Sequence, residues 1–185
     1  MKRLQGPNQS GQAYAFMALT PIVPAEVDAL RTYLHGFLDR GDPSPLSRLP
    51  RTHFGRWVIV PDFVNDPSQP KEDHLGGEYL VFTSSFDGPL GSYLDELCRE
   101  LATEAKEIWG RCIGCPPSAS GPDLKRYLLH NQIDTGFFVA AYPEATVADV
   151  RTALNTRDEL VAFALEAETL EPEQLRTRFL ARFGS

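Results

Sequence analysis

Long apolar runs are missing from this chain of 185 residues. No stretch approaches the roughly 18 consecutive apolar residues that a membrane-spanning helix needs, so we expect no membrane partner. Residues 1–10 contain two basic side chains but no apolar run behind them, which is not the pattern of a signal peptide. We therefore expect a cytoplasmic protein.

Cysteine is also scarce: the chain has three, an odd number that argues against a disulfide framework. Cys112 and Cys115 form a CxxC pair, but a zinc site needs four ligands and no second CxxC exists. Two prolines follow the pair and favour a loop, whereas a thioredoxin-like motif opens a helix. We predict no metal site. A metal-dependent protein using Cys112, Cys115 and His130 is kept as an alternative.

Positive charge is in deficit, because 18 Lys and Arg face 25 Asp and Glu, for a formal net charge of −7. This balance argues against nucleic acid as a partner. The sequence also has no GxSxG elbow, P-loop, HExxH or glycine pattern of a Rossmann fold. No complete catalytic signature is present.

Hydrophobic patterning predicts a definite order of elements. We expect strands at 13–22, 54–63, 78–86 and 136–142, listed in chain order. Helices are expected at about 24–38 and 87–109, with a short helix at 123–132 and further helices after residue 144. The order βαββαβ is the ferredoxin-like plan of the α+β class: an antiparallel sheet with both helices on one face. We predict a loose N-terminus over 1–11, the α+β domain over 12–143 and a helical C-terminal extension over 144–185.

The expected strands are apolar on both faces. Phe54 and Val58 alternate with Trp57 and Ile59, and the run at 136–142 (GFFVAAY) behaves in the same way. An antiparallel sheet with one wet face shows apolar–polar alternation instead. The face away from the helices should therefore be covered, by a second subunit, by the C-terminal helices or around a ligand.

This element order, together with strands that are apolar on both faces, resembles the dimeric α+β-barrel superfamily over residues 12–143. The blocks THFGRW (52–57) and FTSSFDG (82–88) also look like segments of poorly characterised bacterial proteins of this kind. The superfamily includes antibiotic-biosynthesis-type monooxygenases, stress-responsive barrel proteins, chlorite dismutases and dye-decolourising peroxidases. The resemblance implies a ferredoxin-like fold and a pocket location without implying a reaction. The haem enzymes of the group place an axial histidine on a helix beyond the sheet, where His130 is the candidate here. The cofactor is left open, with haem among the possibilities.

Arginine and histidine crowd the start of the second expected strand, in RLPRTHFGR (48–56). One interpretation is an anion-binding mouth with His53 as acid, base or ligand. In the other, Arg56 pairs with Asp62, Asp87 or an acid at a helix end, and His53 caps the loop. Asp87, Gly88 and Pro89 are typical of a helix start. The alternative for Asp87 is a contact with His53 or Arg56 across adjacent strands, which would orient an imidazole. The candidate catalytic residues are His53, Arg56 and Asp87, and the candidate ligand-binding residues are Arg51, Trp57, Ser84 and Phe138.

Two functions remain open at this point. The first is a small-molecule-binding domain, an oxidoreductase or accessory protein for a hydrophobic or haem-like ligand, built on the apolar face beside the Arg/His cluster. The alternative is a non-catalytic dimerisation or interaction module in which that cluster is structural. The expected partners are a small molecule and a second copy of the chain, unless the sheet covers itself.

Overall fold

The computed structural model describes residues 6–39, 43–64 and 67–184. It divides into two compact units, Met1–Val147 and Ala148–Ser185. The first unit holds a four-stranded antiparallel sheet in the order β1-β2-β4-β3. Its strands are β1 (Gln9–Ser10), β2 (Ala13–Pro21), β3 (Thr52–Val60) and β4 (Tyr79–Asp87). The prediction of the α+β class with an antiparallel sheet is confirmed.

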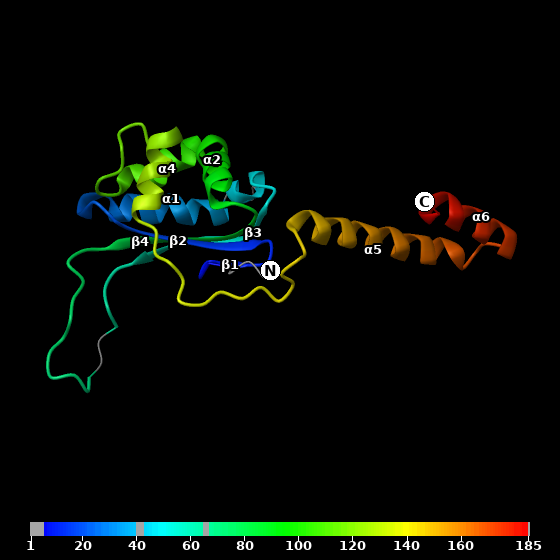
Figure 1. Ribbon diagram of the computed structural model, residues 1–185, viewed down its shortest axis with the longest axis horizontal. Coiled ribbons are helices and arrows are strands. Elements are labelled where there is room, and N and C mark those ends of the chain that lie inside the picture. Colours follow the sequence, from blue (N-terminus) through cyan, green and yellow to red (C-terminus); the bar gives the residue numbers. More distant parts are fainter. Residues whose placement is uncertain (1–5, 40–42, 65–66, 185) are drawn as a thin grey trace. The chain divides into compact units, whose positions relative to one another are not determined.

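One face of the sheet is covered by helices (Figure 1). These are α1 (Val27–Asp39), α2 (Leu90–Glu100), α3 (Ala102–Ile108) and α4 (Gly121–His130), with short 3-10 turns η1 (Pro24–Glu26), η2 (Pro45–Arg48) and η3 (Trp109–Arg111). The core lies between the two layers, where Leu80, Phe82 and Phe86 of β4 are fully buried. Tyr93, Leu94 and Leu97 share the buried face of α2 because residues three and four apart lie on one side of a helix.

The long helix predicted over 87–109 is wrong as a single element. Leu101 leaves helical geometry, with φ −107° and ψ 26°, and separates α2 from α3. Leu101 is itself fully buried, so the break turns the chain while keeping an apolar side chain in the core.

The strand predicted at 136–142 is also wrong: this segment has no regular secondary structure. Residues 131–143 run past the edge of β2 and hold it through three backbone contacts. These are Leu19 N–H to Asn131 O (3.0 Å), Ile133 N–H to Met17 O (2.9 Å) and Gln12 N–H to Pro143 O (2.7 Å). The fourth strand of the sheet is β1 instead, so the βαββαβ order is not established.

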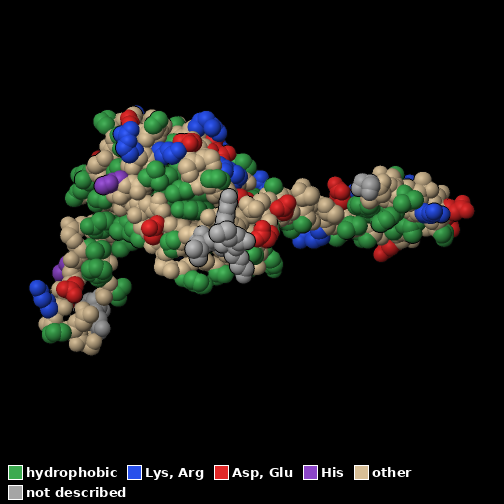
Figure 2. Space-filling model, viewed as in Figure 1, with side chains coloured by type: hydrophobic (Ala, Val, Ile, Leu, Met, Phe, Trp, Pro, Cys, Tyr) green, Lys and Arg blue, Asp and Glu red, His purple; other side chains and the backbone are tan. Residues whose placement is uncertain are grey.

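Apolar side chains remain exposed on the sheet face opposite the helices. Phe54 is 78% exposed and Val58 is 40% exposed. Phe54 lies opposite Ser85, and Val58 lies opposite Val81. Hydrophobic side chains are visible on this side of the first unit in Figure 2. The strands are therefore apolar on both faces, and the helices bury one of these faces while the other has exposed apolar residues.

The second unit consists of the helices α5 (Val147–Ala167), whose first residue belongs to the first unit, and α6 (Pro172–Phe183). The predicted C-terminal helices are therefore present. Phe163 of α5 packs against Phe179 and Phe183 of α6, with ring centroids 5.7 and 5.6 Å away. Glu166 lies 3.5 Å from Arg182 on the same side. Among the described residues, no helix is long and apolar enough to cross a membrane.

Candidate functional site

The candidate site centres on a contact between His53 and Asp87. A bulge between Thr52 and Phe54 takes His53 out of the regular ladder, and bulges commonly redirect a side chain. Its Nε2 lies 2.7 Å from Oδ1 of Asp87, the last residue of β4. Gly88 follows with φ +85°, a left-handed conformation that glycine adopts without strain, and turns the chain toward α2.

Asp87 is nearly buried and uses both carboxylate oxygens. While Oδ1 contacts His53, Oδ2 accepts a hydrogen bond of 2.7 Å from the backbone N–H of Val147. The His53 side chain is 23% exposed. If Nε2 donates to the carboxylate, Nδ1 of the neutral imidazole becomes the acceptor. The pair thus fixes the ring of His53, and Asp87 also holds the backbone at Val147.

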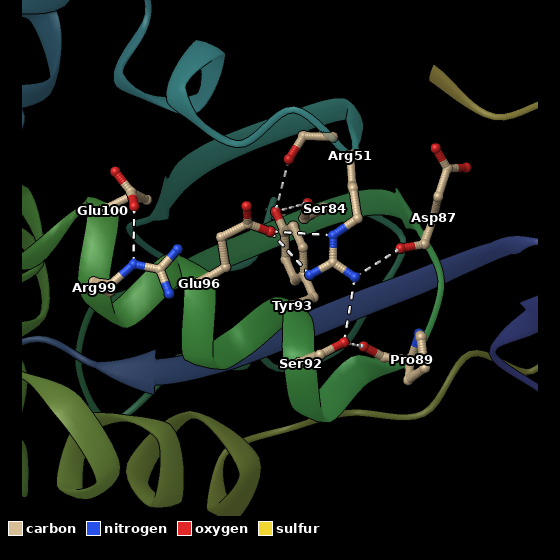
Figure 3. A network of polar contacts seen from close by, with 10 residues as sticks. Arg51, Ser84, Asp87, Pro89, Ser92, Tyr93, Glu96, Arg99 and Glu100 are labelled. Atoms are coloured by element: carbon tan, nitrogen blue, oxygen red, sulfur yellow. Dashed lines mark hydrogen bonds and ion pairs between the residues drawn. The ribbon is translucent and has the colours of Figure 1, made fainter. Parts of the chain in front are cut away.

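Arg51 is paired with polar side chains of α2. Its Nε and Nη2 donate to Oε2 of Glu96 at 3.1 and 2.9 Å, and its Nη1 donates to Ser92 Oγ at 3.2 Å (Figure 3). The guanidinium therefore ties the start of β3 to α2. Arg48 is matched in the same way: its Nη2 lies 2.6 Å from Glu104, beside a cavity of about 310 Å³.

Two of the predicted ligand-binding residues lie on the helix-covered side of the sheet. Ser84 is buried, and its Oγ lies 2.6 Å from the Tyr93 hydroxyl. Trp57 stacks on Phe82, with ring centroids 5.3 Å apart. These contacts are part of the core between sheet and helices.

Arg56, a predicted catalytic residue, and Phe138, a predicted ligand-binding residue, lie elsewhere. Arg56 points to the opposite face, where its Nε donates to Thr83 Oγ1 at 3.2 Å. Phe138 is half-buried in the irregular segment that follows α4. The structure brings together His53 and Asp87, with Arg51 nearby through a 3.5 Å hydrogen bond to the Asp87 carbonyl. No contact among the described residues joins this pair to the remaining candidates, which are Arg56, Trp57, Ser84 and Phe138.

Tyr93 is the polar residue that the sequence reasoning missed. Its hydroxyl lies 2.6 Å from Ser84 Oγ and 3.1 Å from Thr52 Oγ1, and it joins α2 to β3 and β4. Burial raises the pKa of Tyr93 above its usual value. The available signal was a tyrosine in the apolar stripe of a helix, because a buried phenol needs a hydrogen-bond partner.

In the CxxC pair, Cys112 is buried and Cys115 is half-buried. The Sγ of Cys112 accepts a 3.4 Å hydrogen bond from Thr20 Oγ1. Burial raises the pKa of Cys112 and of Cys115 to about 11. Both thiols are therefore protonated near neutral pH, whereas the thiolate is the reactive form and the metal ligand.

Across residues 6–39, 43–64 and 67–184, no group of three or more His, Cys, Asp or Glu side chains could hold a metal ion. His130 is exposed at the end of α4, beside a shallow depression lined also by Asp123, Arg126 and Tyr127. An exposed imidazole among charged side chains does not fit the enclosed axial position of a haem.

The fold and these contacts define an α+β protein with a four-stranded antiparallel sheet and C-terminal helices. Comparisons with protein-family models, with curated proteins and with solved structures found no match to this chain.

Proposed function

We propose that this protein is an interaction module that forms a homodimer through the exposed sheet face. We call this surface the open face and define it by register positions that point to one side of β2, β3 and β4. Its residues are Ala15, Met17, Leu19, Phe54, Arg56, Val58, Val81, Thr83 and Ser85.

The exposure of Phe54 and Val58 is the observation that carries the proposal. Scattered exposed apolar residues are common, but a contiguous apolar patch on a sheet is typical of an interaction surface. The polar groups nearby are already paired: Arg51 with Glu96, Arg48 with Glu104 and His53 with Asp87. This pairing favours the structural interpretation of the Arg/His cluster.

A second copy is the occupant that the face fits. Arg56 is the single charged residue among the nine positions, so two such faces meet with little burial of charge. Three strands of nine residues cover roughly 30 by 14 Å, or about 400 Å² before side-chain relief is counted. A stable interface uses about 800 Å² per partner. The neighbouring segment adds Phe137 and Val139, which are exposed, and brings the available area toward that value.

This proposal includes the finer fold assignment. The order β2, α1, β3, β4, α2, with the helices on one side, follows the first five elements of the ferredoxin-like plan. Two such sheets packed face to face would form the dimeric barrel arrangement that the sequence resembles.

Sedimentation of the full chain tests the proposal. Val58→Asp places a charge among the apolar side chains of the open face, and we expect the concentration needed for self-association to rise at least tenfold. Leu38→Asp is the matched control, because Leu38 is an exposed apolar residue on α1. Equal association of wild type and Val58→Asp, with both cooperatively folded, would refute the homodimer.

Small-molecule binding is a second candidate function, favoured by the His53–Asp87 geometry. A carboxylate that orients an imidazole beside an apolar surface is a common arrangement for acid–base chemistry or ligand recognition. Benzoate combines an apolar ring with a carboxylate and can be titrated while tryptophan fluorescence is followed. Weaker binding by His53→Ala and Arg56→Ala, but not by His35→Ala, would support this function. Absence of saturable binding by the wild type would count against this class of ligand.

A further inference from the structure

Helix α5 has two apolar sides, and only one of them is occupied within its unit. Phe163 is buried against Phe179 and Phe183 of α6. Four other apolar residues fall within an arc of roughly 60° on the opposite side, because each residue advances a helix by about 100°. They are Val150, Leu154, Val161 and Leu165, which are 44–67% exposed, and we call them the α5 stripe.

Helix α6 does not cover the α5 stripe. It packs on the Phe163 side, and its 12 residues extend about 18 Å against about 32 Å for the 21 residues of α5. The unit spans only Ala148–Ser185, below the size of about 40 residues at which chains fold alone without extra support. Hydrophobic side chains are accordingly visible at its surface in Figure 2. A partner that buried the stripe would supply the missing stabilisation.

The spacing of the stripe is symmetric about its midpoint. Val150 lies seven positions before Arg157, and Leu165 lies seven positions after Asp158. Leu154 lies three positions before Arg157, and Val161 lies three positions after Asp158. Two antiparallel copies of α5, related by a two-fold axis at that midpoint, therefore match residue for residue. Val150 would meet the partner's Leu165, and Leu154 would meet the partner's Val161. Such self-complementarity is what an isologous interface requires.

The charges of α5 favour the same orientation. Residues 147–157 carry Arg151, Arg157 and Asp149, for a formal charge of +1, and residues 158–167 carry only acids, for −3. Antiparallel pairing places the positive half of one helix against the negative half of the other. Parallel pairing would place the acidic halves together, and like charges across a helix pair destabilise it.

We propose that α5 is a second self-association surface, at which two copies of the chain pair antiparallel about Arg157 and Asp158. This surface lies outside the open face and goes beyond the sheet dimer. The stripe extends about 23 Å along the helix, so its contact area falls at the low end for protein interfaces. Arg157 would contact the partner's Asp158 in addition to Asp158 of its own chain, which lies 2.8 Å away.

Cysteine cross-linking in the full chain tests the orientation. Arg157→Cys lies at the two-fold axis and should form a disulfide-linked dimer with mild oxidation. Val150→Cys alone should not, because the two copies of residue 150 would lie about 22 Å apart. Val150→Cys combined with Leu165→Cys should cross-link. Dimer formation by Val150→Cys alone would show parallel pairing, and no dimer in any variant would show that the stripe is covered by the chain itself. Either result overturns the proposal, and the unsubstituted chain controls for its own cysteines.

Sedimentation separates this surface from the open face. In a chain that carries Val58→Asp, we expect self-association to persist and to weaken at least tenfold when Leu154→Glu is added. Asn155→Glu is the matched control in the same turn, since Asn155 lies outside the stripe. Arg157→Asp should weaken association, and Arg157→Asp with Asp158→Arg should restore it.

The two proposals fail in different ways. Loss of all association in Val58→Asp would leave the sheet dimer standing and refute the α5 pairing. Undiminished association when Leu154→Glu is added to the chain that carries Val58→Asp would likewise refute it. Unchanged helix content by circular dichroism confirms that each variant is folded.

Discussion

Breaking the His53–Asp87 contact should destabilise the protein measurably. The pair is 2.7 Å apart and largely shielded from water. A hydrogen bond that involves a charged group contributes about 1.5–3 kcal/mol to stability. We therefore expect His53→Ala to lower the free energy of unfolding by about 1.5–3 kcal/mol. Asp87→Ala should cost more, about 3–5 kcal/mol, because it also leaves the buried N–H of Val147 without its acceptor.

A double-mutant cycle isolates the pair itself. The two single substitutions should sum to more than the double substitution by about 1.5–3 kcal/mol, since the contact can be lost only once. Urea unfolding followed by tryptophan fluorescence reports these values, because Trp109 is fully buried in the core. A coupling below about 0.5 kcal/mol would refute the structural role assigned to the contact.

The chain offers a matched control in His74 and Asp62. These residues are also paired, with Nδ1 2.8 Å from Oδ2, but both side chains are exposed. The backbone N–H of Leu75 and the His74 side chain lower the pKa of Asp62 to about 2. Water competes for an exposed contact, so the His74–Asp62 cycle should give a coupling well below that of His53–Asp87. Equal couplings would show that burial is not the source of the difference.

Three further perturbations have definite expected outcomes. Tyr93→Phe removes a buried hydroxyl with two partners and should lower the free energy of unfolding in urea by about 1–3 kcal/mol. Gly11→Ala should cost at least about 1 kcal/mol, because φ is +61° and the new Cβ would lie 2.0 Å from the Pro143 carbonyl oxygen; faster hydrogen exchange at the Gln12 amide would report the loss. Raising the pH from 9 to 11 should destabilise the wild type more than Cys112→Ala. The Cys112 thiol, with a pKa of about 11 in the folded state, stays protonated after the unfolded chain has ionised.

Three strands of the sheet could be predicted because hydrophobic patterning and the strand propensity of the residues agreed. Alternating side chains rich in aromatic and β-branched residues predicted strands at 13–22, 54–63 and 78–86, and the structure has them within about three residues. Helix boundaries were less accessible. The break at Leu101 carries no proline or glycine, so no local signal in the sequence marks it.

The site was predictable in part. His53 and Asp87 end adjacent strands, so register alone allowed their contact, which the structure contains. The ion pair of Arg51 could not be predicted from the sequence, because its partner Glu96 lies 45 positions away in the chain. The contacts of Ser84 and Trp57 were not accessible from the sequence either. Ser84 lies against the Tyr93 hydroxyl and Trp57 stacks on Phe82, both between the sheet and the helices, and their ligand-binding role stays a prediction.

The missing strand at 136–142 shows what sequence patterning leaves out. The run GFFVAAY has strong strand propensity, but a strand also needs a free edge whose N–H and C=O groups it can pair with. At one end of β2 that edge is taken by β1, where Ser10 lies opposite Ala13, and at the other end it is taken by Asn131 and Ile133. The run lies between these two contacts and bonds to β1 through the side chain of Ser10, whose Oγ accepts from the N–H of Ala140. Two of its apolar residues, Phe137 and Val139, therefore remain exposed.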